Sequence, residues 1–332
     1  MKPNREPLIS VVLPTYNVAQ YLQQCLESVA AQTYRNIEVI IIIDGATDGS
    51  YEIAQDFCKT DSRFSVYWQE NAGSGPARNN GLAHSQGEFV MFVDPDDWIE
   101  PELLEKLYEA QGEGDYDLVA STRIKVECDS KGQVKRIIPK HLANETIVGQ
   151  DAVRHEYLRM LRTGVVSSPT QKLFKLSVIR KNHVEFPPLK RSQDIVFNYR
   201  YYSCIQSLRL ISYSGYYYRV MPTQTAGKSH ADYYKTIIFL YNDIQAMYQS
   251  WGIAFPEQEM CNWFFRVRIY SNLQKSVAQG WDMAYLLGNP TIQHIVQTAK
   301  PSTSYLKMTQ RLVLSRSYKM LKLFLKLIIF IK

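Results

Sequence analysis

The stretch that matters most for the fold runs from Phe89 to Asp97 and reads Phe-Val-Met-Phe-Val-Asp-Pro-Asp-Asp. Its first five residues are apolar, and a short apolar run of this kind is typical of a buried strand. Three carboxylates, Asp94, Asp96 and Asp97, follow directly. A hard divalent cation that holds a phosphate would neutralise them, because such ions take oxygen ligands and keep sites for substrate phosphates. The alternative is a simple turn with an Asp cap before a helix at Pro101.

The residues upstream alternate between strand and helix patterns. Apolar runs predict strands at residues 8–13 (closed by Pro14), 37–43, 64–68 and 89–93. The segments between them predict a helix at 18–30 with Asn17 as its cap, a helix at 49–59 with Asp48 as its cap, and a short helix from Pro76. This alternation over the first ~120 residues indicates a doubly wound α/β sheet, in which ligands bind at the carboxyl ends of the strands.

The second half of the chain follows a different pattern. Strands are predicted at residues 117–128, 133–138, 207–212 and 216–220, and a helix is predicted at 150–162. From Ala231 onward the pattern is helical, with breaks at Trp251-Gly252 and at Gly280. We therefore expect a first domain over residues 1–230 and a helical C-terminal region over residues 231–332.

The net charge of +6 belongs to the end of the chain. Residues 300–332 contain eight Lys or Arg and no Asp or Glu, which leaves 30 basic and 32 acidic residues in positions 1–299. Because the body is slightly acidic, nucleic-acid binding is disfavoured. Five scattered cysteines without a CxxC pair favour a reducing compartment. The first residues lack the apolar segment of a signal peptide, so we expect a cytoplasmic protein.

Residues at the expected strand ends suit a nucleotide diphosphate. Tyr16 can lay its ring against a planar base, and Asp44 can accept a hydrogen bond from an imide N–H of that base. The loop with Gly73 leads into a helix N-terminus suited to an anion, and the planar fork of Arg78 binds phosphate oxygens in pairs. The structural alternatives are a packing ring for Tyr16, a turn residue for Asp44 and a surface helix charge for Arg78.

The segment from Ser10 to Pro101 resembles the nucleotide-sugar domain of the family 2 glycosyltransferases, which have the GT-A fold. Four stretches carry the resemblance: Val-Val-Leu-Pro-Thr-Tyr-Asn (11–17), Asp-Gly-Ala-Thr-Asp-Gly-Ser (44–50), Gly-Pro-Ala-Arg-Asn-Asn-Gly-Leu (75–82) and Asp-Pro-Asp-Asp-Trp-Ile-Glu-Pro (94–101). Where the family usually has Asp-Asp-Gly-Ser, this chain has Ile43-Asp44-Gly45-Ala46. The second Asp, which contacts the base in this family, is retained.

The resemblance implies a GT-A (Rossmann-like) α/β domain with a mixed sheet, followed by the helical extension. It also implies a nucleotide-diphospho-sugar donor, most often UDP-linked, with Mn²⁺ or Mg²⁺ on the diphosphate. Asp94 would bind the ribose or support the cation, Asp96 and Asp97 would hold it, and His230 is a further candidate ligand. The implied donor-binding residues are Pro14, Thr15, Tyr16, Asn17, Asp44, Gly73, Arg78, Asp94, Pro95 and Asp96.

Inverting transfer also needs a base for the acceptor hydroxyl. The family places it in a Glu-Asp pair that opens a helix about 100 residues after the metal motif. The segment 190–197, downstream of Lys172-Leu173-Phe174, matches that pattern, so the resemblance gives Asp194 as the base; the alternative is a helix N-cap. Gln193 stands where the family commonly has Glu. In the later Tyr-Arg segment, Arg219 or Lys228 is a candidate contact for the diphosphate.

The last residues predict an amphipathic helix. Arg316, Lys319, Lys322 and Lys326 recur at helical spacing, and apolar residues fill most of the rest. The longest unbroken apolar run, 327–331, is far shorter than the ~20 residues that a membrane span needs. The pattern favours a helix lying in an anionic membrane surface, at the inner face of the cell membrane. The alternative is a helix packed on the body or in a homodimer.

These observations favour an inverting glycosyltransferase. A membrane location would suit an acceptor saccharide on a polyprenyl diphosphate, as in bacterial capsule or exopolysaccharide assembly. One competing hypothesis is a non-catalytic sugar-nucleotide-binding or scaffold subunit of a glycan assembly complex. Another is a nucleotidyltransferase, which is disfavoured because residues 8–20 contain no glycine for the expected signature loop.

Overall fold

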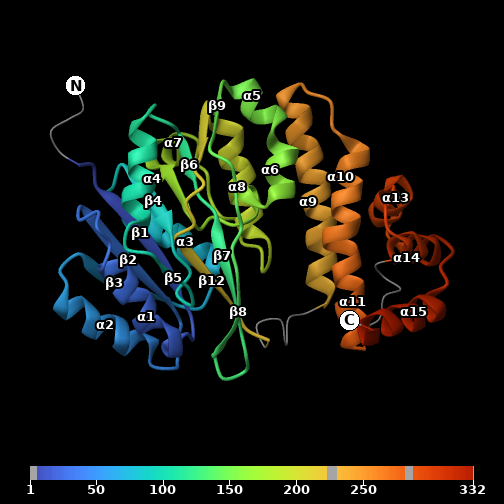
Figure 1. The fold of residues 1–332 in the computed structure, drawn as a ribbon, viewed down its shortest axis with the longest axis horizontal. Coiled ribbons are helices and arrows are strands. Elements are labelled where there is room, and N and C mark those ends of the chain that lie inside the picture. Colours follow the sequence, from blue (N-terminus) through green and yellow to red (C-terminus); the bar gives the residue numbers. More distant parts are fainter. Residues whose placement is uncertain (1–5, 223–229, 281–286, 332) are drawn as a thin grey trace. The chain divides into compact units, whose positions relative to one another are not determined.

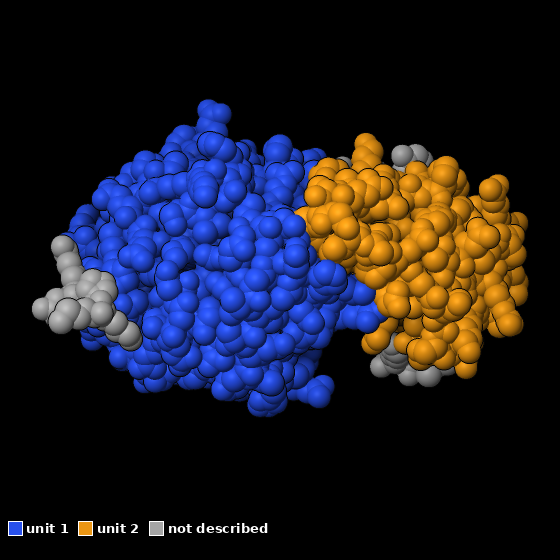
Figure 2. All heavy atoms as spheres, turned by 90° about the horizontal axis from the view of Figure 1, so that it is seen from above, with its two compact units in different colours: residues 1–226 blue, residues 227–332 orange. Residues whose placement is uncertain are grey.

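The computed structural model describes residues 6–222, 230–280 and 287–331. The chain divides into two compact units, residues 1–226 and 227–332, drawn in blue and orange in Figure 2. The first unit is a mixed α/β structure, and the described part of the second is helical (Figure 1).

An eight-stranded mixed sheet forms the centre of the first unit, in the order β3-β2-β1-β4-β10-β6-β11-β9 (Figure 1). The first four strands along the chain are parallel to their neighbours in this set, whereas β10 runs antiparallel to both β4 and β6, and β9 runs antiparallel to β11. The strands are β1 (Ile9–Thr15), β2 (Ile37–Asp44), β3 (Phe64–Gln69), β4 (Phe89–Phe92), β6 (Leu118–Ala120), β9 (Glu145–Val148), β10 (Lys172–Lys175) and β11 (Ser207–Leu210).

Helices cover both faces of this sheet, which explains why β1 is buried along its whole length. Alternate residues of a strand point to opposite faces. Leu13 faces a core that includes Leu26 and Leu103, whereas Val12 faces Gly81 on the other side. The helices of this half are α1 (Ala19–Ala30), α2 (Ser50–Thr60), α3 (Ser74–His84) and α4 (Leu103–Gly112).

The predicted elements of this half are present, with four corrections. The N-cap residue of α2 is Gly49 and not Asp48, and α3 begins at Ser74, two residues before Pro76. Pro14 does not close the first strand but lies within β1, paired with Ile42. The Val12 carbonyl accepts a hydrogen bond from the Val93 N–H, and the nitrogen of Pro14, two residues later, points to the same side of the strand. At that position β4 has already ended, so no neighbouring strand needs a hydrogen-bond donor from Pro14. Asn17 does not cap α1, because its side chain accepts from Thr47 N in the next loop.

The prediction for the second half was wrong in more places. The expected strand at 117–128 is two strands in different sheets, β6 and β7 (Arg123–Cys128), and the expected helix at 150–162 is two helices, α5 (Gln150–His155) and α6 (Tyr157–Thr163). Strands β9 and β10 were not predicted. The other helices of this half are α7 (Leu176–Lys181), α8 (Gln193–Cys204) and the 3-10 turn η1 (Val165–Ser167).

A smaller sheet of four strands lies beside the end of β4, in the order β5-β12-β7-β8. It contains β5 (Trp98–Ile99), β12 (Tyr216–Val220) and β8 (Val134–Ile138) in addition to β7. Because β5 follows the Asp94–Asp97 turn directly, pairing of β12 with β5 places residues 216–219 against that turn.

The described helices of the second unit are α9 (His230–Trp251), α10 (Glu257–Trp263), the π-helix η2 (Phe264–Tyr270), α11 (Ser271–Ala278), α13 (Pro290–Thr298), α14 (Ser304–Leu314) and α15 (Tyr318–Ile331). The predicted breaks are confirmed: α9 ends at Trp251, and Gly252 and Gly280 both have positive φ. Across the three described ranges, we find no helix long and apolar enough to cross a membrane.

Candidate functional site

The loops that follow β1, β2, β3 and β4 emerge at one edge of the sheet, since these strands are parallel and in register. Tyr16 lies in the first of these loops and is 50% exposed, which leaves its ring available to a planar ligand. Asn17 accepts from Thr47 N at 2.8 Å, and Asp48 accepts from Ala19 N at 2.9 Å. These bonds join the first loop to the second.

Asp44 organises the loop after β3. Its buried carboxylate accepts from Gln69 Nε2 at 2.7 Å, from Ala72 N at 2.8 Å and from Gly73 N at 2.8 Å. A carboxylate has about four acceptor positions, so these bonds leave one for a ligand. Gly73 has φ +97°, a conformation that a residue with a side chain rarely adopts. The sequence did not indicate this positioning role of Asp44.

Arg78 joins the third loop to the fourth. Its guanidinium donates to Asp94 Oδ1 at 2.7 Å and lies 5.4 Å from the centre of the Phe186 ring. The side chain is buried, so it is not the surface helix charge of the alternative interpretation. Its Nε has no hydrogen-bond partner within the described chain. A buried guanidinium that keeps a free donor is chemically suited to bind a phosphate oxygen.

The carboxylates of the Asp94–Asp97 turn point in different directions. Asp97 is 1% exposed, and its carboxylate accepts from Tyr216 Oη and from Arg219 N, both at 2.8 Å. Burial, followed by the charges of Asp96 and Asp94, raises the pKa of Asp97 well above its ordinary value. Asp97 therefore holds β12 to the turn, while Asp94 and Asp96 remain partly exposed.

Arg219 is buried between two aromatic rings. Its guanidinium carbon lies 4.6 Å from the ring centres of both Tyr21 and Trp98, and its Nε donates to the Asp96 carbonyl at 2.8 Å. These contacts give Arg219 a structural role under the turn, where sequence analysis offered a diphosphate contact as one possibility. Lys228 lies outside the described residues, and so does the side chain of His230 at the start of α9.

The N-terminus of α8 lies against the N-terminus of α3. The Gln193 amide donates to Ser74 Oγ, and a Cβ added to Gly75 would meet the Gln193 side chain at 3.4 Å. Asp194, in the first turn of α8, is thereby held beside the loop that Asp44 organises. Gln193 is buried, so a neutral amide in place of the family's usual Glu avoids a buried negative charge at this contact.

Lys172 is a buried basic residue to which sequence analysis assigned no role, beyond noting the segment Lys172-Leu173-Phe174 upstream of the expected base. It begins β10, is fully buried, and its Nζ donates to the carbonyls of Ser168 and Thr170. Burial lowers the pKa of Lys172 well below its usual value, and the positive charge of Arg123 adds to this effect, whereas the charge of Asp194 opposes it. Because β10 is antiparallel to β4, Lys172 starts at the same sheet edge as Asp94.

The residues present fit a divalent cation. Mg²⁺ and similar hard ions commonly bind through one or two carboxylates together with substrate phosphates and water. Asp96 and Asp94 offer such carboxylates beside Arg78. No group of three or more His, Cys, Asp or Glu that could hold an ion without a ligand's help occurs among the described residues. The donor set is therefore suited to an ion that arrives with a diphosphate.

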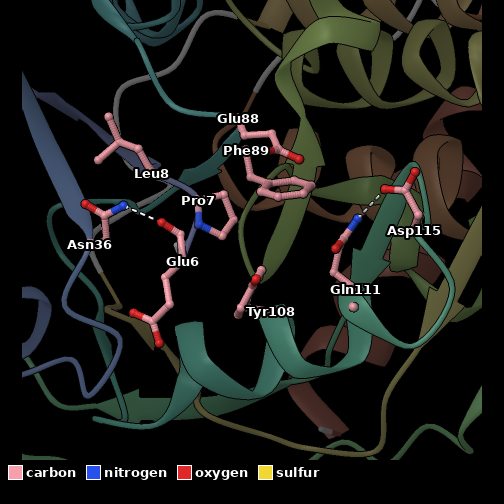
Figure 3. A pocket seen from close by; sticks show the side chains of 10 residues that line it. Glu6, Pro7, Leu8, Asn36, Glu88, Phe89, Tyr108, Gln111 and Asp115 are labelled. Atoms are coloured by element: carbon pink, nitrogen blue, oxygen red, sulfur yellow. Dashed lines mark hydrogen bonds between the residues drawn. The ribbon is translucent and has the colours of Figure 1, made fainter. Parts of the chain in front are cut away.

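A cavity of about 590 Å³ opens at the opposite edge of the sheet (Figure 3). It lies at the amino ends of β1, β2 and β4, where Leu8, Asn36 and Glu88 precede these strands. Figure 3 shows Tyr108 and Gln111 of α4 in its wall. Its lining among the described residues includes Glu6, Glu88 and Asp115 but neither Lys nor Arg, so this part of the cavity does not suit a diphosphate.

The first unit, a mixed sheet with polar loops at the carboxyl ends of its parallel strands, has the GT-A architecture. Residues 10–168 match the family model described as glycosyl transferase family 2. The putative glycosyltransferase EpsH of Bacillus subtilis is 30% identical over 248 residues, which are 74% of this chain and 70% of EpsH. Glycosyltransferase GlyG of Streptococcus pneumoniae is 33% identical over 219 residues, 64% of this chain and 70% of GlyG.

The chain therefore belongs to glycosyl transferase family 2, and it is a glycosyltransferase. Among solved structures, residues 1–349 of Staphylococcus aureus TarS in complex with UDP-GlcNAc have the same fold. That structure aligns with a TM-score of 0.71 at 21% identity, and the alignment covers 96% of this chain and 90% of the TarS chain. The GT-A fold expected from the sequence is confirmed, with its mixed sheet and helical C-terminal region.

Proposed function

We propose that this glycosyltransferase moves a sugar from a UDP-linked donor to a hydroxyl of a saccharide acceptor in polysaccharide biosynthesis, with inversion at the sugar carbon. The observation that carries the proposal is the contact between α8 and α3. Gln193, which precedes Asp194, donates to Ser74 Oγ of α3, one helical turn before the Arg78 that pairs with Asp94. The UDP-GlcNAc complex of the TarS relative supports a UDP-sugar as donor class.

We assign a role to each donor-site residue, supported by its geometry. Tyr16 stacks on the base, and the remaining acceptor position of Asp44 faces the base or ribose. Arg78 binds diphosphate oxygens through its guanidinium, whose orientation Asp94 fixes. Pro14 and Thr15 end β1 just before Tyr16, Asn17 joins the first loop to the second, and Pro95 lies between Asp94 and Asp96 in the turn.

Transfer then needs one proton movement. The acceptor oxygen forms a bond to the sugar C1 as the bond between C1 and the diphosphate oxygen breaks. Asp194 takes the hydroxyl proton, and UDP leaves with the electron pair. Mn²⁺ or Mg²⁺ held by Asp96 with Asp94, when bound, would stabilise the negative charge on the leaving group. Asp97 keeps the turn in place through its bonds to Tyr216 and Arg219, so its buried carboxylate would be less available to the ion than those of Asp94 and Asp96.

We further propose that α15 attaches the protein to the cytoplasmic face of the cell membrane. Leu321 and Leu325 are buried within the second unit, while Met320, Leu323 and Leu327 are 58%, 65% and 57% exposed. Exposed Lys319, Lys322 and Lys326 lie among them. An apolar strip flanked by cations is complementary to an anionic lipid surface. Such a location suits an acceptor carried on a polyprenyl diphosphate.

Calorimetric titration with UDP, GDP and ADP tests the donor assignment. With Mn²⁺ present we expect UDP to bind and the other two nucleotides to bind weakly or not at all. Removal of the ion with EDTA should abolish most of the UDP affinity, because two carboxylates would then face the diphosphate without a cation. Failure of every nucleotide to bind would contradict the proposal.

Asp194→Asn separates catalysis from binding. A positioned base contributes roughly 10²–10⁴ in rate, so we expect kcat for sugar transfer to fall by about that factor. The Kd for UDP should stay within about two-fold of the unmodified protein's value, because asparagine has the shape of aspartate and lacks only its ability to accept the proton. Asp151→Asn on α5, where the side chain is 88% exposed, is the matched control. Normal turnover in Asp194→Asn would favour the non-catalytic scaffold hypothesis.

A further inference from the structure

Three cations lie together at the edge of the sheet that carries Asp94, on the side of β6 and β10. Lys172 pairs with Ala120 across these strands, and Arg123 begins β7 three residues further along the chain. Lys140 joins them through Ser214, whose hydroxyl bonds both Thr122 Oγ1 and the Lys140 carbonyl. The site described above uses none of these three charges for the donor.

The cluster has more positive than negative charge. Arg123 and Lys140 both lower the pKa of Lys172, and Arg123 also lowers the pKa of Lys140, although burial is the larger cause for each lysine. Asp194 is the carboxylate that opposes this effect at Lys172. Neither Arg123 nor Lys140 forms an ion pair with any carboxylate in the described chain. A cluster in this state attracts an anion.

The three cations have different access to solvent. Lys172 is fully buried and holds the segment 168–170 through two carbonyls, so it supports the cluster from inside. Arg123 is partly exposed, and its guanidinium carbon lies 4.5 Å from the centre of the Tyr218 ring. Lys140 is exposed along most of its side chain, but its Nζ is partly buried where it bonds the Thr163 carbonyl and lies against Gly164. Arg123 and Lys140 are therefore the two that can reach a ligand.

Tyr218 relates this pair of cations to the donor turn. Tyr218 lies on β12 two residues after Tyr216, which pairs with Arg123 across β7 and β12 and whose hydroxyl bonds the Asp97 carboxylate and the Asp94 N–H. Arg123 thus lies within electrostatic reach of the donor turn, and through Lys172 it shares a charge cluster with Asp194.

We propose that Arg123 and Lys140 bind a phosphate group of the acceptor, next to the hydroxyl that Asp194 deprotonates. This inference rests on the proposed function and names a chemical feature of its acceptor. The planar guanidinium of Arg123 binds two phosphate oxygens together, and Lys140 adds a mobile point charge. The phosphate belongs either to a diphosphate that carries a lipid-linked saccharide or to a polyol phosphate chain.

Titration of the UDP-saturated protein tests the subsite, because excess UDP and Mg²⁺ occupy the donor site. The probes are geranyl diphosphate for the lipid source, glycerol 3-phosphate for the polyol source, and glycerol as the uncharged control. The variants are Arg123→Gln and Lys140→Gln. Lys135→Gln on β8 is the matched control, since it removes one exposed positive charge several residues away from the cluster.

We expect at least one phosphate probe to bind and glycerol not to bind. Arg123→Gln should weaken that binding about ten-fold or more, and Lys140→Gln a few-fold, as charge-assisted hydrogen bonds are lost. Lys135→Gln should leave the Kd within two-fold, and UDP affinity should be unchanged in all three variants. The tighter of the two probes identifies the source of the phosphate.

Two results would overturn the inference and leave the proposed function intact. One is that neither probe binds the UDP-saturated protein. The other is that Arg123→Gln weakens UDP as much as the probes, which would assign Arg123 to the donor diphosphate. If Arg123→Gln does not fold, the exposed Lys140→Gln variant decides the question by the same criteria. Failure of the unmodified protein to bind UDP would instead contradict the proposed function.

Discussion

Asp44 shows how one side chain can fix the shape of a binding loop before any ligand is bound. Its carboxylate accepts hydrogen bonds from the backbone N–H groups of Ala72 and Gly73 and from the side-chain amide of Gln69. The sequence placed Asp44 at a strand end and gave it a base contact from the family resemblance. The three donors lie 25 to 29 residues later, at the end of β3 and in the loop after it, which no local pattern could indicate.

Asp44→Asn should loosen this loop. An amide has one acceptor oxygen, and its NH₂ group faces N–H donors, so at least one buried bond is lost. We expect the free energy of unfolding to fall by about 1–3 kcal/mol and the UDP affinity to fall about ten-fold. Urea denaturation and calorimetry measure the two effects. Asp56→Asn on α2, with its 74% exposed side chain, should change neither quantity, and equal effects in both variants would contradict this role.

Asp97 and Arg219 mark the limit of residue-level prediction. Three aspartates in one turn look equivalent in sequence, yet Asp97 is buried by Tyr216 and Arg219, about 120 residues further along the chain. Arg219 likewise looked suited to a diphosphate but stacks between Tyr21 and Trp98. In each case a distant strand, β12, decides which polar group faces the solvent.

At the level of elements, the predictable part is the part with strong periodicity. The strands β1 and β2 are long, apolar and covered on both faces, so their patterns were legible. The strands β9 and β10 have four residues each, and β10 begins with a lysine. A lysine at the start of a strand does not fit an apolar strand pattern. Lys172 can be buried because two backbone carbonyls accept hydrogen bonds from its amine. Such a strand is recognised only once its neighbours β4 and β6 are known.

The packing of α3 on β1 makes a sharp prediction at this scale. A Cβ at Gly81 would lie 2.3 Å from Val12 Cγ1, so Gly81→Ala forces the helix away from the sheet. We expect a loss of about 1–3 kcal/mol in the free energy of unfolding. UDP affinity should fall as well, because α3 carries Arg78 and follows the loop that Asp44 organises.

A double-mutant cycle checks that cause. Val12→Ala removes the clashing methyl groups, so the double variant Gly81→Ala/Val12→Ala should be less destabilised than the sum of the two single variants. A coupling of about 1 kcal/mol or more is expected for side chains in direct contact. Additive effects within about 0.5 kcal/mol in urea denaturation would show that the helix does not depend on this contact.

At the scale of the whole molecule, charge is distributed unevenly along the chain. Residues 300–332 carry eight basic residues and no acidic ones, whereas the preceding 299 residues carry a small excess of acidic residues. The sequence predicted the amphipathic helix, and the structure adds which of its apolar residues are buried. Burial of Leu321 and Leu325 could not be read from the pattern, because the helix has apolar residues around much of its circumference.

The exposed strip of α15 predicts binding to anionic vesicles. Each Lys near an anionic surface contributes about 1 kcal/mol, so Lys319→Gln/Lys322→Gln/Lys326→Gln should weaken binding roughly 100-fold. Co-sedimentation with vesicles of phosphatidylglycerol and phosphatidylcholine measures it, and 0.5 M salt should weaken binding further. Lys131→Gln/Lys135→Gln/Lys181→Gln makes the same charge change at exposed positions of the first unit and should bind normally. Equal binding to pure phosphatidylcholine, or equal losses in both triple variants, would show that the cations of α15 do not direct the protein to a membrane.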